Sequence, residues 1–260
     1  MSINSELHGT TLRIQINRPE KKNAITADMY LAMAEAIAAA ASDPRIRAVL
    51  LHGLPTVFTA GNDLEDFAKR PPTASDAPVM RFIHALGGCE LPVVAAVNGL
   101  AVGIGATMLL HCDLAYCATD SVLSMPFVSL GLCPEFASSA LLPLQAGWHG
   151  AVEKLLLGDP IHADEAVRMR IVNAALAPHE VLPHALRQAE RFAAMPPLAV
   201  RESKRLMKRA FRGMLEPVIA DEAEVFMRLL RGAEAKEAFT AFFERRKPDF
   251  SALPTDISAV

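Results

Sequence analysis

Residues 92–97 read Pro-Val-Val-Ala-Ala-Val, a short run without a single polar side chain. Side chains alternate between the two faces of a β-strand, so a strand that is apolar throughout must be buried on both faces. Strands of this kind belong to parallel sheets that are covered by helices. The run therefore predicts the interior of an α/β structure, and Asn98-Gly99 after it predicts a turn.

Strand and helix signals alternate through most of the chain, and helical signals dominate its end. Pro196-Pro197 marks the change, so we expect a β/α core over 1–195 and a helical region over 196–260. In the helical region we expect three helices, near 198–212, 217–231 and 233–246. The other expected elements include a hairpin over 3–17, a helix over 26–42, strands over 46–52 and 57–59, a mobile loop over 73–78, and strands over 113–117 and 121–124.

Composition limits the classes of function. Hydrophobic residues make up 52% of the 260 residues, enough for a sizeable core, and the net charge of −3 argues against broad binding to nucleic acid. The four cysteines form no C-x-x-C pair, which is typical of a reducing compartment. Residues 1–10 lack the pattern of a secretory signal, and no apolar run is long enough to span a bilayer. We expect a cytoplasmic protein that binds neither membrane nor nucleic acid.

Several common catalytic motifs are absent from the sequence. There is no H-x-x-x-H, H-E-x-x-H or G-x-S-x-G, so we expect neither a metal site nor a serine esterase. Residues 102–108 match a dinucleotide-binding fingerprint only in part, because the third glycine is missing. NAD is therefore not an expected cofactor.

Glu135 is the single acid in the apolar and small-residue stretch 127–139. Neighbours such as Phe127 and Phe136 should partly desolvate it, which raises a carboxyl pKa and suits a general base near neutral pH. Alternatively, Glu135 opens a helix over 136–144, where any acid is favoured by the positive end of the helix dipole. By itself the stretch leaves both interpretations open.

Two strand-to-helix junctions carry glycine, at Ala60-Gly61-Asn62-Asp63 and at Gly103-Ile104-Gly105. Glycine allows close approach of the backbone, and the start of a helix offers free N–H groups. Two N–H groups aimed at one point form an oxyanion hole, in which each donor can be worth roughly 3 kcal/mol of transition-state stabilisation. The alternative is that the glycines serve only tight packing of helix on strand.

Five separate segments together resemble the crotonase (enoyl-CoA hydratase/isomerase) superfamily over about residues 11–250. They are Asn17-Arg18-Pro19 with Asn23-Ala24, the run from Phe58 to Leu64, the run from Pro92 to Gly99, Gly103-Ile104-Gly105, and Cys112-Asp113-Leu114. The resemblance implies an α/β fold of spiralling ββα units with a helical C-terminal region, and a homotrimer or hexamer. It implies an acyl-CoA thioester as substrate, so that coenzyme A is part of the substrate and no further cofactor is needed. It also implies that the N–H groups of Asn62 and Ile104 hold the thioester oxygen.

The departures from the family pattern concern its acids. Hydratases of the family use two glutamates, and the corresponding positions are Thr107 and Phe127 here. Residues 131–135 read Gly-Leu-Cys-Pro-Glu, which resembles the Δ3,Δ2-enoyl-CoA isomerases and their single carboxylate. This resemblance implies that Glu135 moves the double bond of a 3-enoyl-CoA to the 2-position, in fatty-acid β-oxidation or related acyl-CoA metabolism. Open alternatives are an enoyl-CoA hydratase, an acyl-CoA hydrolase, and a non-catalytic acyl-CoA-binding scaffold.

The expected catalytic residues are Glu135, Asn62 and Ile104. The expected substrate-binding residues lie in the matched segments or around Glu135: Ala24, Ala60, Gly61, Asp63, Leu64, Gly103, Thr107, Phe127 and Leu132. A basic band over 201–212 is interpreted first as a solvated helix face, then as a contact for the phosphates of CoA, and last as an RNA contact.

Overall fold

Strand β5 (Val93–Val97) lies inside a six-stranded sheet in the computed structural model, which describes residues 2–70, 76–251 and 253. Its neighbours are β3 (Ala48–His52) and β7 (Leu114–Ala118), and both run parallel to it. The strand order is β1-β2-β3-β5-β7-β10, and only the hairpin of β1 and β2 is antiparallel. The remaining strands of this sheet are β1 (Ile3–His8), β2 (Thr11–Ile16) and β10 (Ala174–Leu176).

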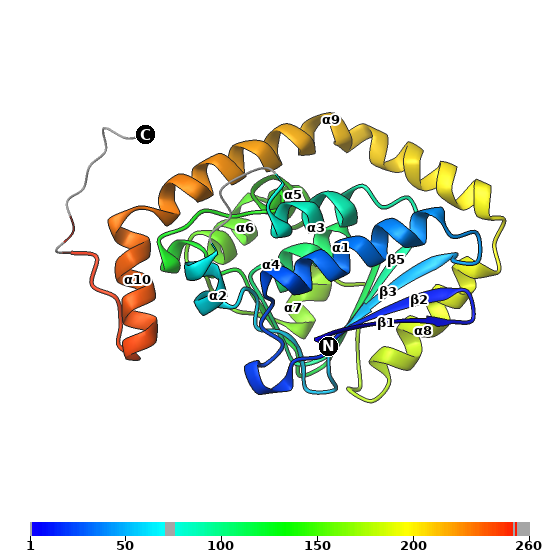
Figure 1. Cartoon of the computed structure of the whole chain (residues 1–260), viewed down its shortest axis with the longest axis horizontal. Coiled ribbons are helices and arrows are strands. Elements are labelled where there is room, and N and C mark those ends of the chain that lie inside the picture. The colour runs from blue at the N-terminus through cyan, green and yellow to red at the C-terminus, as the bar shows by residue number, and fades with distance from the viewer. Residues whose placement is uncertain (1, 71–75, 252, 254–260) are drawn as a thin grey trace.

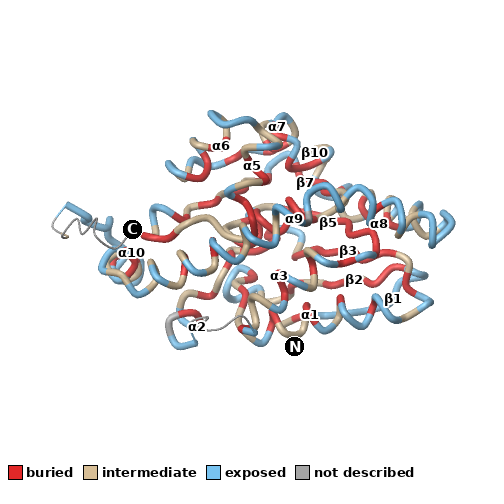
Figure 2. Tube along the Cα trace, turned by 90° about the horizontal axis from the view of Figure 1, so that it is seen from above, coloured by how far each residue is buried: buried red, intermediate tan, exposed pale blue. Residues whose placement is uncertain are grey.

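All five residues of β5 are buried, and they serve two hydrophobic cores. Val94 and Ala96 face a smaller core under α8 (Val181–Ala193), whereas the alternate side chains enter the larger core that includes α1 (Ala27–Ser42) and α3 (Pro78–Gly87). Figure 2 shows the buried strands β2, β3 and β5 between α1 and α8, and both helices carry exposed residues. Burying an aliphatic side chain contributes roughly 1.5–3 kcal/mol, so β5 stabilises both cores. The prediction of a strand buried on both faces is confirmed.

The structure has a second sheet of four strands. After each central strand of the first sheet, the next strand along the chain belongs to this second sheet. It contains β4 (Val57–Thr59), β6 (Leu100–Val102), β8 (Val122–Ser124) and β9 (Ile161–His162), in that order. The chain thus passes from β3 to β4 and α2 (Leu64–Lys69), and from β5 to β6 and α4 (Ile104–Thr107). This repetition of strand, strand and helix is the expected ββα arrangement, and the α/β fold class is confirmed.

The other helices connect these units or follow them. They are η1 (Pro19–Lys21), η2 (Met108–His111), η3 (Val128–Leu130), α5 (Ser138–Ala146), α6 (Trp148–Leu155), α7 (Ala163–Arg168), α9 (Pro197–Leu230) and α10 (Ala233–Glu244).

Helix α9 is continuous over 34 residues and arches over the rest of the molecule (Figure 1). The predicted break before Pro217 is therefore wrong. A proline inside a helix removes one backbone hydrogen bond, but packing holds α9 on both sides of it. On one side, Lys204 donates to Asp113 Oδ2 at 2.5 Å. On the other, the buried Phe226 packs edge-on against Phe67.

The same contact corrects the interpretation of the basic band. Lys204 is only 8% exposed, and its Nζ also donates to the carbonyl oxygen of Leu91 at 2.6 Å. Lys208 donates to Gly87 O at 3.0 Å. These two lysines fasten α9 to the core, and only part of the band faces solvent.

Two further expectations concern the loop and the membrane. The expected mobile loop over 73–78 falls in part on residues 73–75, which lie outside the described residues, and α3 already begins at Pro78. Across residues 2–70, 76–251 and 253, no helix combines the length and apolar character needed to cross a bilayer.

Candidate active site

The two glycine junctions lie against each other at the carboxyl ends of β4 and β6. These strands are parallel neighbours, with Thr59 opposite Ala101. Gly61 has a φ of +83°, and a Cβ atom there would lie 2.7 Å from Val102 O and 3.9 Å from Gly103 N. Only glycine tolerates both this φ and this contact, so Gly61 brings the two helix starts together.

At each junction, the residue that follows the glycine has a backbone N–H group without a protein acceptor among the described residues. These residues are Asn62 and Ile104, the first residue of α4. By contrast, Asp63 N donates to Ile25 O and Gly103 N donates to Ser124 O, each at 2.9 Å. Unpaired backbone N–H groups in the interior are rare in folded proteins. Two of them at adjoining junctions can receive one oxygen atom of a ligand.

The segment after β2 braces the first junction. Asn23 is fully buried, and its Nδ2 donates to Ile16 O at 2.8 Å and to Phe58 O at 3.0 Å. Thr59 Oγ1 donates to Asn23 O at 2.6 Å and accepts from Gly61 N at 3.0 Å. These bonds fix the backbone that leads to Asn62 and explain the Asn-Ala pair in the sequence.

Both carboxylate oxygens of Asp63 accept hydrogen bonds from other groups of the protein. Its Oδ2 accepts from Arg18 Nη1 at 2.6 Å, and its Oδ1 accepts from Asp66 N at 3.0 Å at the start of α2. Burial alone would raise the pKa of Asp63, but the bonds from Asp66 N and Arg18 lower it below its usual value. Its carboxylate therefore stabilises the loop beside Asn62.

The turn that carries Glu135 is not helical. Helix α5 begins only at Ser138, and both Phe136 and Ala137 are left-handed, each with a φ of +56°. The prediction of a helix from residue 136 is wrong at its start, and so is the alternative that Glu135 is an ordinary acid in the first turn of a helix. The ring of Phe136 stacks on His111, and His111 Nε2 lies 2.7 Å from Phe136 O.

Glu135 is held close to the second junction. Thr107, buried in the first turn of α4, donates its hydroxyl hydrogen to Glu135 Oε1. Burial raises the pKa of Glu135 to about 8, the negative charge of Glu222 adds to this, and the bond from Thr107 opposes it. A carboxyl group with such a pKa can take up and release a proton near neutral pH.

Tyr30 is a site residue that sequence reasoning missed. It lies buried on α1, and its hydroxyl donates to Asn62 Oδ1 at 2.5 Å. Burial raises the pKa of Tyr30 well above its usual value, and the nearby charge of Glu135 raises it further. In the sequence, Tyr30 lies among the apolar residues of one helix face. Only its hydroxyl group distinguishes it from an ordinary core residue.

A cavity of about 210 Å³ lies on the Asn62 side of the site. Tyr30, Asn62 and Phe67 are among the residues that line it, between α1, α2 and the start of α3. It is large enough for a small apolar group. Within the described residues, no group of three or more His, Cys, Asp or Glu side chains is placed to hold a metal ion.

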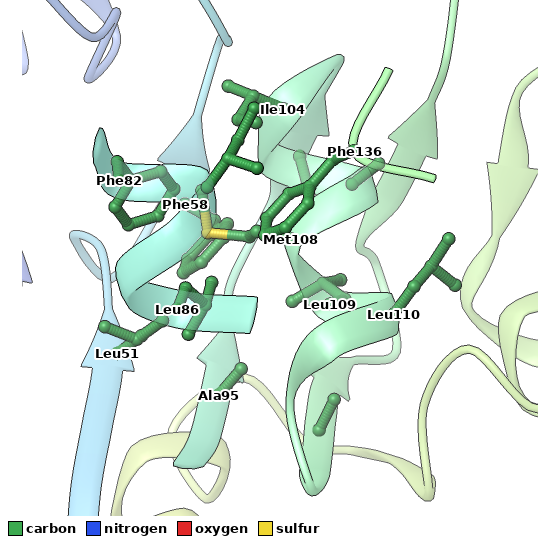
Figure 3. Close-up of a cluster of buried hydrophobic side chains, with 14 of the residues drawn as sticks. Leu51, Phe58, Phe82, Leu86, Ala95, Ile104, Met108, Leu109, Leu110 and Phe136 are labelled. Atoms are coloured by element: carbon green, nitrogen blue, oxygen red, sulfur yellow. The ribbon is translucent and has the colours of Figure 1, made fainter. Parts of the chain in front are cut away.

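The remaining predicted residues frame these groups. Phe127 and Leu132 are buried, and Leu132 N donates to Phe127 O at 2.9 Å, which closes the turn before Glu135. They share the larger core with Ile104, which Figure 3 shows beside Phe58, Met108 and Phe136. Ala24, Ala60 and Leu64 are half-buried along the segments that flank Asn62.

Comparison with known proteins places this geometry in a family. The sequence model described as Enoyl-CoA hydratase/isomerase matches residues 6–252. Crotonyl-CoA hydratase of Syntrophomonas wolfei is 34% identical over 244 residues, which cover 91% of this chain and 93% of that protein. Enoyl-CoA delta isomerase 2 of Homo sapiens is 32% identical, over 90% of this chain and 61% of that protein. The structure of Pseudomonas aeruginosa OdaA is 47% identical with a TM-score of 0.92, over 94% of this chain and 99% of that one.

The raised pKa of Glu135 predicts how Glu135→Gln changes stability with pH. Between about pH 4.5 and 8 the folded state keeps the proton and the unfolded chain has lost it. Wild-type stability therefore falls with rising pH by up to about 1.4 kcal/mol per unit, a loss that Gln does not suffer. We expect urea unfolding at pH 5, 6.5 and 8 to show a growing advantage of Glu135→Gln. A difference that stayed constant with pH would contradict the assignment.

Proposed function

The chain belongs to the enoyl-CoA hydratase/isomerase family, and we propose that it is an isomerase that shifts the double bond of a 3-enoyl-CoA to the 2-position. The observation that carries this proposal is the pairing of Glu135 with Thr107. Thr107 stands where hydratases of the family have one of their two acids, and it hydrogen-bonds the carboxylate that remains. A single carboxylate is sufficient for moving a proton between two carbons of one substrate.

The reaction proceeds through an enolate. Glu135 removes a proton from C2, the electrons of that C–H bond form a new double bond, and negative charge gathers on the thioester oxygen. The N–H groups of Asn62 and Ile104 stabilise this oxygen, each donor contributing roughly 3 kcal/mol at the transition state. Protonated Glu135 then gives its proton to C4, and the double bond comes to lie between C2 and C3. The carboxylate is regenerated, so the reaction needs no cofactor beyond the coenzyme A of the substrate.

A hydratase is the second candidate, and the name of the S. wolfei relative favours it. Addition of water needs an acid and a base around one water molecule. Thr107 and Phe127 occupy the two positions where the family has these acids, and neither side chain transfers protons near neutral pH. A site with Glu135 as its single acid favours isomerisation over hydration or thioester hydrolysis. A non-catalytic acyl-CoA-binding scaffold is the remaining alternative.

Activity should depend on the carboxyl group of Glu135. We expect wild type, with a 3-enoyl-CoA in deuterated water, to exchange hydrogen at C2 and to raise the ultraviolet absorbance of the conjugated thioester. Glu135→Gln cannot accept the proton, so both signals should fall by at least about 10³-fold, within the range of a lost general base.

Each of the competing functions gives a different result in this assay. Full activity of Glu135→Gln would contradict the proposed role of Glu135. Rapid addition of water to a 2-enoyl-CoA by wild type would support the hydratase instead. Binding of acyl-CoA without any exchange would support the scaffold.

The contact of the two junctions should be needed for the proposed oxyanion hole. In Gly61→Ala the new methyl group meets Val102 O and separates the N–H groups of Asn62 and Ile104. We expect kcat/KM to fall about 10²- to 10³-fold, as for the loss of one oxyanion donor. Gly147→Ala is the matched control, because its φ is +80° and no atom lies within 4 Å of the new Cβ. Equal losses of kcat/KM in the two variants would contradict this account.

We also propose that the chain assembles as a trimer or as a pair of trimers. Several apolar side chains on the outer face of α9 favour burial between copies, including Leu206, Met207 and Phe211, which are all exposed in the single chain. Sedimentation velocity should give three or six times the mass of one chain. A stable monomer at micromolar concentration would contradict this proposal.

A further inference from the structure

We propose that Glu222 of α9 is a positioning residue for Glu135, because it holds the turn that carries this carboxyl group and sets the charge beside it. The inference rests on the function proposed for Glu135. It assigns to the long C-terminal helix a direct influence on the chemistry of the core.

Within the described part of the chain, both carboxylate oxygens of Glu222 accept hydrogen bonds from this turn. Glu222 is only 7% exposed, its Oε2 accepts from Ala137 N at 2.6 Å, and its Oε1 accepts from Ser139 N at 3.0 Å. These N–H groups lie at the start of α5, where a helix offers no acceptor of its own. The carbonyl oxygen of Glu222 also accepts from Cys133 Sγ at 3.6 Å. The chain is thus bonded to α9 on both sides of Glu135.

The turn needs such support because it is strained. Phe136 and Ala137 are consecutive left-handed residues, and neither is glycine. Such conformations persist only where surrounding contacts impose them, and they occur preferentially at functional sites. His111 binds the carbonyl oxygen of Phe136 from one side, and Glu222 binds the N–H groups from the other. Without Glu222, the turn can relax towards an ordinary helix start and move the Glu135 carboxyl group.

The charge of Glu222 is the second part of the inference. Burial raises the pKa of Glu222, and the N–H bonds from Ser139 and Ala137 oppose this rise by favouring the ionised form. The titratable groups around the turn are Tyr30 on α1, His111 on η2, Cys133 within the turn, and Arg228 on α9. The pKa of His111 is lowered to about 4 by burial and that of Cys133 is raised to about 11. Both are therefore neutral at pH 7, and the negative charge that acts on Glu135 comes from Glu222.

A titration of Glu135 without substrate tests the charge. The side-chain carboxyl carbons can be followed by NMR in protein made with 13C-labelled glutamate, with the Glu135 signal assigned by its loss in Glu135→Gln. We expect Glu222→Gln to lower the titration midpoint of Glu135 by roughly half a pH unit or more. Glu224→Gln, which removes an exposed acid from the same helix, should leave the midpoint unchanged.

Amide exchange tests the positioning. In Glu222→Gln only one of the two N–H bonds can be kept, so exchange at Ala137 and Ser139 should be at least about tenfold faster than in wild type. Glu222→Asp keeps the charge, so it should speed exchange while leaving the titration midpoint of Glu135 near that of wild type. In the isomerase assay, Glu222→Gln should move the acidic limb of kcat to lower pH and lower its plateau about tenfold.

An unchanged Glu135 midpoint or unchanged exchange at Ala137 and Ser139 in Glu222→Gln would overturn the inference. Neither measurement requires turnover. A wild-type protein that shows the expected titration and exchange but no isomerisation would count against the proposed function alone.

Discussion

The site depends on the contact between the Gly61 backbone and the carbonyl group of Val102. Parallel pairing of β4 with β6 brings two helix starts to one edge of the smaller sheet, but only a residue without Cβ can close the remaining distance. Asn62 and Ile104 each follow one of the two glycines at this contact, so their N–H groups lie at adjoining junctions. An oxygen that gains charge during a reaction is stabilised most by donors already in position, because no reorganisation is then needed.

Around this contact, three segments far apart in sequence converge on one carboxyl group. Thr107 comes from α4, Tyr30 from α1 and Glu222 from α9. Keeping Glu135 in apolar surroundings lowers the stability of the folded protein above the usual pKa of a glutamate. The same surroundings give the carboxyl group a pKa suited to taking and returning a proton. Burial of Glu135 therefore lowers the free energy of unfolding and raises the proton affinity of its carboxyl group.

Patterns local in sequence predicted the fold well. The apolar run of β5 and the glycines at both junctions follow from backbone geometry, which sequence records directly. The left-handed Phe136 and Ala137 were not predicted, because neither residue type favours that conformation by itself. Tyr30 and Glu222 acquire their roles only through tertiary contacts with Asn62 and with the Glu135 turn. The local preference of Pro217 predicts a helix start there, whereas packing on both sides keeps α9 continuous.

The central claim is that one carboxyl group carries the proton from C2 to C4. A 3-enoyl-CoA deuterated at C2, converted in ordinary water and followed by mass spectrometry and NMR, tests this most directly. We expect some product molecules to carry the deuterium at C4, because Glu135 returns what it removed within an apolar site. Product that forms at the full rate with no deuterium at C4, even at the lowest conversion, would contradict the account and indicate a separate acid.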